Sequence, residues 1–174
     1  MAVVGDGAVG LCAILAARRL GAERIVALSR YPQRQAVARA FGAADVVAER
    51  GRAAVAAVRD LTGGRGAPHV LQCVGTQESL ETAIHSARRG GWVGFVGVPH
   101  VTDPKPIGDL IGRSVGLCGS GAWVRHYLPD LLDDVLAGTL DASPVFDLEL
   151  PLEQAAEGYA AMDERRAIKV LLRP

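Results

Sequence analysis

The fold is decided near the start of the chain by the stretch VVGDGAVG, residues 3–10. Val3 and Val4 are typical of a buried strand, and they run directly into a loop that holds three glycines. Apolar residues then recur at helical spacing as far as Leu20, and Gly21 is typical of the end of a helix. The stretch therefore predicts a strand, a tight glycine-rich turn and a helix.

Outward from this stretch, short apolar runs alternate with helical patterns. Further strands are expected at residues 24–28, 46–47, 70–74, 92–98 and 116–119. Helices are expected at residues 32–41, 53–61, 79–87 and 123–136. Because strands that alternate with helices form βαβ units, the sequence predicts an α/β fold with a doubly wound parallel Rossmann sheet of about six strands.

The pattern changes from Ser143 onward. Strands are expected at residues 146–150 and 168–172, with a helical stripe over residues 152–162 between them. We therefore expect a dinucleotide-binding domain over residues 1–142 and a C-terminal helix–strand appendix over residues 143–174, which needs another surface to pack on.

Composition narrows the class of protein. The 174 residues are 49% hydrophobic, which suits one α/β domain, and 19 basic residues balance 19 acidic ones. The balanced charge gives no reason to expect a nucleic-acid partner, and no apolar run approaches the ~20 residues of a membrane span. With no signal peptide in the sequence, a cytoplasmic location without membrane association is expected. The three cysteines and four histidines are scattered, so no metal site is expected within this chain.

The glycine spacing is that of a phosphate-binding loop. Gly5 suits a tight turn, Gly7 allows a pyrophosphate to approach the backbone, and Gly10 allows close contact between helix and strand. Backbone N–H groups at the start of the following helix would face the phosphates. The expected contact residues are Gly5, Asp6, Gly7, Ala8, Val9 and Gly10. A glycine loop that serves only as a turn, or one that binds S-adenosylmethionine, remains an alternative.

The end of the second strand indicates which dinucleotide binds. NAD sites usually place an Asp or Glu there to accept hydrogen bonds from the ribose, whereas this chain has Ser29 and Arg30. A hydroxyl and a guanidinium suit the 2′-phosphate of NADP, since arginine binds phosphate through two parallel hydrogen bonds. The sequence predicts NADP(H) in preference to NAD(H), unless Arg30 is simply solvated.

Two further loops follow strands at the edge where ligands of such sheets bind. Val74 and Gly75 follow the fourth expected strand, and Gly97 and Val98 close the fifth. They either reach the nicotinamide ribose or simply end their strands. His100 is the best lone acid–base candidate, although a surface role suits it better, and no Tyr-x-x-x-Lys pair is present. No catalytic residue is therefore assigned.

These features together resemble the cofactor domain of the zinc-dependent medium-chain dehydrogenase/reductase family, which includes alcohol dehydrogenases. The resemblance covers essentially the whole chain. It is carried, in order, by residues 3–10, Phe41-Gly42-Ala43, residues 60–66, Gln72-Cys73-Val74-Gly75, Gly90-Gly91-Trp92-Val93, Val96-Gly97-Val98-Pro99 and Ala167-Ile168-Lys169-Val170.

The resemblance implies an oxidoreductase that transfers a hydride between NADP(H) and an alcohol or carbonyl substrate. It also implies a GroES-like catalytic domain that supplies the zinc ligands. None of that domain is present in this sequence, so the chain alone is expected to be inactive. By the same resemblance, residues 143–174 would pack on the catalytic domain and Lys169 would lie near the pyrophosphate. A homodimer would form through an edge strand near Val115 to Gly119.

Two other functions are compatible with the residues alone. A stand-alone nucleotide-binding or sensor module would bind the same cofactor without catalysis. A methyltransferase would bind S-adenosylmethionine at the glycine loop and bind no dinucleotide.

Overall fold

The computed structural model describes residues 1–98, 105–119 and 121–174. They form two compact units, Met1–Ser120 and Gly121–Pro174.

The first unit contains one sheet of six strands in the order β3-β2-β1-β4-β5-β6, and each pair of neighbours is parallel. The strands are β1 Ala2–Val4, β2 Val26–Leu28, β3 Asp45–Val47, β4 Ala67–Gln72, β5 Ala87–Phe95 and β6 Gly116–Cys118. The helices are α1 Ala8–Arg19, α2 Pro32–Ala40, α3 Gly51–Leu61, α4 Gln77–Ser86 and α5 Lys105–Arg113. The predicted doubly wound parallel sheet of about six strands is confirmed.

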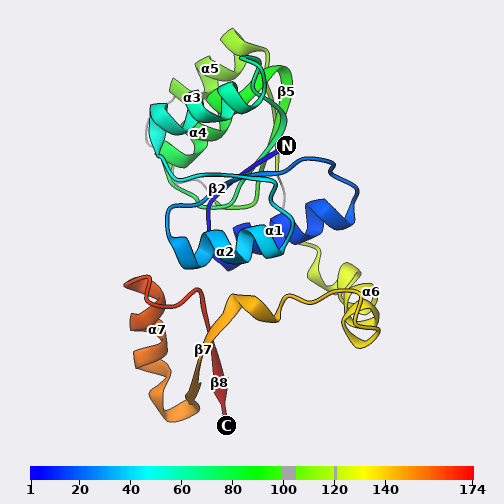
Figure 1. Cartoon of the computed structure of the whole chain (residues 1–174), viewed down its shortest axis with the longest axis vertical. Helices are drawn as coiled ribbons and strands as arrows, with labels where there is room; N and C mark the ends of the chain where they lie inside the picture. Colours follow the sequence, from blue (N-terminus) through cyan, green and yellow to red (C-terminus); the bar gives the residue numbers. More distant parts are fainter. Residues whose placement is uncertain (99–104, 120) are drawn as a thin grey trace. The chain divides into compact units, whose positions relative to one another are not determined.

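Helices cover both faces of this sheet. In Figure 1, α1 and α2 lie on one face, and α3, α4 and α5 lie on the other. The strand order reverses between β1 and β4, because the chain crosses from one face to the other after β3. In sheets of this kind, ligands bind beyond the carboxyl ends of the strands at that reversal.

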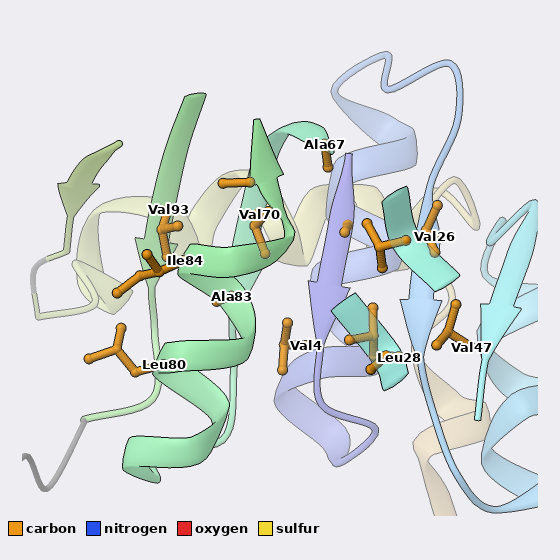
Figure 2. Packing of buried hydrophobic residues seen from close by; sticks show 14 of the residues in the cluster. Val4, Val26, Leu28, Val47, Ala67, Val70, Leu80, Ala83, Ile84 and Val93 are labelled. Carbon is orange, nitrogen blue, oxygen red and sulfur yellow. The ribbon is translucent and has the colours of Figure 1, made fainter. Parts of the chain in front are cut away.

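The core lies between the sheet and the helices of the second face. In Figure 2, Leu80 and Ile84 of α4 lie near Val93, whereas Val26 and Leu28 lie on the other side of Val4; all of them belong to one buried apolar cluster. Val3 and Leu11 are fully buried as well. β1 and β2 are buried on both faces, which explains why their sequences are continuous apolar runs instead of alternating ones.

The strands end earlier than predicted. β4 ends at Gln72 and β5 at Phe95, so Val74, Gly97 and Val98 lie in the loops that follow. β5 also begins at Ala87, before the predicted start at Trp92, because Arg88 to Gly91 do not have the apolar pattern of a strand. Helix α5 was not predicted.

The second unit is smaller. It contains α6 Val124–Leu136, β7 Phe146–Pro151, α7 Ala155–Asp163 and β8 Lys169–Arg173, with β7 and β8 paired in parallel. The Asp147 carboxylate accepts a hydrogen bond of 2.7 Å from the Ile168 N–H, which fastens the start of β8 to β7. The division between the units precedes α6, whereas the predicted domain boundary follows it.

Within the described part of the chain, every helix is too short or too polar to span a membrane.

Candidate functional site

The glycine loop forms the turn between β1 and α1. Gly5 has φ of +119°, a conformation that favours glycine, and a Cβ there would lie 2.8 Å from Cγ2 of Val74. A Cβ at Gly10 would collide with the carbonyl oxygen of Gly5, so this glycine lets α1 pack directly against the loop. A Cβ at Gly7 would meet no atom within 4 Å. The loop is therefore closed on its inner side and open at Gly7.

The start of α1 suits an anion. Gly7 is the N-cap, no side chain caps the helix, and its first turn holds no acidic residue. The first N–H groups of a helix need an acceptor and carry the positive end of the helix dipole. A pyrophosphate can supply that acceptor, which is the fit that a dinucleotide requires of this loop.

A carboxylate does lie at the end of β2, but it comes from the glycine loop. Oδ2 of Asp6 accepts hydrogen bonds from Oγ of Ser29 at 3.2 Å and from the Arg30 N–H at 3.0 Å. Nη1 of Arg34 lies 3.7 Å from Oδ1 of Asp6 and donates to the Asp6 carbonyl at 3.2 Å. Asp6 and Arg34 are 8% and 5% exposed, so this ion pair is buried.

This arrangement leaves one charged side chain of the group facing solvent. Ser29 is buried and its hydroxyl is bonded to Asp6, while the side chain of Arg30 is exposed. The guanidinium carbon of Arg34 also lies over the Tyr31 ring, 5.5 Å from its centre, which is a cation–π contact. Arg30 is therefore the cation that a ligand at the end of β2 can reach.

The loops after β4 and β5 pack against each other beside the glycine loop. Gly75 has φ of +96°, and a Cβ there would lie 2.8 Å from the carbonyl oxygen of Val98. A Cβ at Gly97 would lie 2.6 Å from the Gly75 nitrogen. The contact between Gly5 and Val74 joins the first loop to this pair. Three of the sequence-predicted segments thus lie together at the carboxyl edge of the sheet.

Gln72, at the end of β4, ties the second and third loops together. Its fully buried amide, oriented to satisfy both of its ends, accepts from the Gly75 N–H at 2.9 Å and donates to the Gly97 carbonyl at 3.2 Å. The sequence analysis assigned no role to Gln72 or Arg34. A glutamine and an arginine within apolar surroundings are the signal that could have found them, since buried polar groups need partners.

One predicted site residue belongs to the second unit. Lys169 is the exposed first residue of β8 in the second unit, where its N–H donates to Asp147 at 3.3 Å. Its predicted place near a pyrophosphate stays a prediction. Pro99 and His100 are outside the described residues.

A zinc site does not fit the described residues. Among residues 1–98, 105–119 and 121–174, no three His, Cys, Asp or Glu side chains are grouped to hold a metal ion. Cys73 lies close to the glycine loop, but burial raises the pKa of its thiol to about 11, so it is protonated at neutral pH.

Comparison with known proteins identifies the family. A family model described as zinc-binding dehydrogenase matches residues 8–137. The chain is 37% identical, over 178 aligned residues, to a probable zinc-binding alcohol dehydrogenase of Mycobacterium tuberculosis, covering 100% of this chain and 45% of that protein. A geraniol dehydrogenase of Castellaniella defragrans is 33% identical, with 99% and 47% covered.

A solved structure has the same fold. The alcohol dehydrogenase TADH from Thermus sp. ATN1 matches with a TM-score of 0.88 and 36% identity, covering 99% of this chain and 50% of that one. The chain thus spans about half the length of the relatives it matches. These comparisons give no support to a sensor module or a methyltransferase. The chain belongs to the zinc-binding dehydrogenase family and corresponds to its NAD(P)-binding part.

Proposed function

We propose that this chain binds NADP(H) in preference to NAD(H), as part of an oxidoreductase that acts on an alcohol or carbonyl substrate. The observation that carries the preference is the arrangement around Asp6. Its carboxylate already accepts hydrogen bonds from Ser29 and the Arg30 N–H and forms an ion pair with Arg34, while the Arg30 side chain is exposed to solvent. A guanidinium at this position can bind a 2′-phosphate through two hydrogen bonds.

The other predicted residues would contact different parts of the cofactor. The N–H groups after Gly7 would bind the pyrophosphate, and Lys169 would add a positive charge there. The loops that contain Val74–Gly75 and Gly97–Val98 would hold the nicotinamide ribose. When bound, NADP(H) supplies or accepts the hydride, and this chain's own residues bind and orient it. No catalytic residue is assigned to the described residues.

Calorimetric titration with NADPH and NADH tests the preference. We expect tighter binding of NADPH, and we expect Arg30→Ala to weaken it by about 1.5–3 kcal/mol, the range for a hydrogen bond to a charged group. NADH binding should change far less. The matched control is Arg39→Ala, which removes an exposed arginine from α2, the helix that follows Arg30. It should leave both affinities unchanged.

An equal loss of affinity for both cofactors in Arg30→Ala would overturn the role of Arg30 at the 2′-phosphate. A titration with S-adenosylmethionine provides the negative ligand control.

We further propose that the protein is a cytoplasmic homodimer with no nucleic-acid or membrane partner. The dimer contact would use the segment Val115–Gly119, which includes β6. In support, β6 is an edge strand, and unpaired edge strands favour pairing with another chain.

A further inference from the structure

Five arginines surround a hollow at the edge of the sheet opposite the glycine loop. Arg65 precedes β4, and Arg88 and Arg89 lie at the start of β5. Arg113 is the last residue of α5, the helix before β6. Arg59 lies near the carboxyl end of α3. The hollow has a volume of about 490 Å³ and is lined by Arg59, Gly64, Arg65, Arg88, Arg89 and Arg113. Its described lining contains no acidic residue.

Two of these arginines have structural partners. Arg59 donates to the His85 carbonyl at 3.2 Å, and Arg113 donates to the carbonyls of Ala87 at 2.9 Å and His85 at 3.3 Å. They therefore satisfy backbone acceptors at the carboxyl end of α4, where cations are favoured. Even so, Nε of Arg113 is buried without a hydrogen-bond partner among the described residues.

The other three arginines are not explained by packing. Arg89 makes one long contact of 3.4 Å to the Gly112 carbonyl. Within the part of the chain that the structure describes, the side chains of Arg65 and Arg88 make no hydrogen bond or ion pair, and both are exposed. Their guanidinium groups are available to a ligand.

The arginines act on one another electrostatically. Burial, followed by the like charges of Arg59 and Arg89, lowers the pKa of Arg113, and the attraction of Asp109 only partly opposes this. Asp109 is paired with His85 at 2.9 Å, and Glu78 and Glu81 line a neighbouring hollow that Arg59 and Arg113 also line. Arg65, Arg88 and Arg89 line only the hollow without acidic residues. Like charges that lie together with no carboxylate in the lining favour the binding of an anion.

We propose that this hollow is a binding site for a polyphosphate group, either free or carried by a nucleotide. Its volume falls within the ~300–1,000 Å³ of small-molecule sites. Guanidinium groups match phosphate oxygens in pairs, so the unpaired Arg65 and Arg88, with the exposed Arg89 beside them, suit a chain of two or three phosphates. The site is separate from the cofactor loops, which lie at the other ends of the strands.

Calorimetry with inorganic tripolyphosphate at low salt tests this proposal. NADPH is included to keep the probe off the glycine loop, and the titration is repeated without it. We expect one saturable site, and the double variant Arg65→Gln/Arg88→Gln should weaken binding by at least about tenfold, because each arginine contributes a charge-assisted hydrogen bond. Neither side chain has a structural partner, so the melting temperature should not change.

The control double variant, Arg39→Gln/Arg125→Gln, removes two exposed arginines from other helices and the same net charge. It should bind tripolyphosphate like the parent protein. Arg30→Ala should also retain this binding, so failure of the cofactor proposal and failure of this one are distinguishable. The absence of a saturable site, or an equal loss in the control, would overturn the proposal.

A second titration with ATP distinguishes the two sources of the group. Tighter binding of ATP than of tripolyphosphate would assign the site to a nucleotide, and equal binding would assign it to the phosphate chain alone.

Discussion

The Asp6–Arg34 pair shows how one residue of the glycine loop can organise the end of a neighbouring strand. The carboxylate accepts hydrogen bonds from Ser29 and the Arg30 backbone and forms an ion pair with Arg34. A buried carboxylate needs such partners, because losing one leaves an uncompensated charge that costs about 3–5 kcal/mol. The network therefore fixes the position of Arg30 without using its side chain.

Cys73 makes folding stability depend on pH in the alkaline range. Burial raises the pKa of its thiol from 9.0 to about 11. Between these values, the unfolded chain loses the proton and the folded chain keeps it, so stability that is present below pH 9 is lost as the pH rises towards 11. The loss is on the order of 2–3 kcal/mol, since one pKa unit corresponds to about 1.4 kcal/mol.

Urea unfolding between pH 8 and about pH 10.5 measures this effect. We expect Cys73→Ala to lose less stability over this range than the parent protein. Gln33→Ala, at an exposed position of α2 that carries no titratable group, is the control and should follow the parent. Identical pH slopes for all three proteins would rule out a contribution from Cys73.

At the scale of elements, Gln72 couples the loops that follow β4 and β5. Replacing it with leucine keeps a similar volume but leaves the Gly75 N–H and the Gly97 carbonyl without this partner. We expect Gln72→Leu to lower the free energy of unfolding by about 1–3 kcal/mol, and to weaken NADPH binding because the two loops lose their shared anchor.

Chemical denaturation and calorimetry on the same preparation measure both effects. Gln33→Leu, at an exposed position of α2, is the matched control and should change neither. Unchanged cofactor affinity in a destabilised Gln72→Leu protein would limit Gln72 to a role in folding.

The apolar strands and the longer helices of the first unit were predictable because their residues repeat with a clear period. Helix α5 was not, since its nine residues include Pro106, Gly108 and Gly112, which are poor helix formers. The glycine loop was equally predictable, from the spacing of its three glycines. The Asp6–Arg34 and Gln72–Gly97 contacts were not, because they join residues far apart in the sequence and only the folded sheet brings them together.

At the scale of the whole molecule, the proposed homodimer depends on the open edge of β6. β6 pairs with β5 on one side, and no strand of the described chain covers its other side. Sedimentation velocity should give twice the 18.2 kDa mass of one chain. Cys118→Glu places a negative charge at the exposed end of β6, and a symmetric pair would bring two such charges together, so we expect monomers.

Ala48→Glu is the control, because it adds the same charge just after β3, at the opposite edge of the sheet. It should remain dimeric. A monomeric parent protein, or dissociation of both variants, would argue against pairing through β6.

The network around Asp6 has a consequence for how this protein can evolve. An aspartate introduced at Ser29 would bring a second buried carboxylate against the first, and two such groups oppose each other's ionisation. Loss of the carboxylate at Asp6 would instead take from Arg34 its buried counter-ion. Each of these substitutions destabilises the protein until the other one compensates for it, so the order of substitutions matters. If Arg30 selects the cofactor as proposed, we expect this coupling to make the preference harder to change than the exposed position of Arg30 alone would suggest.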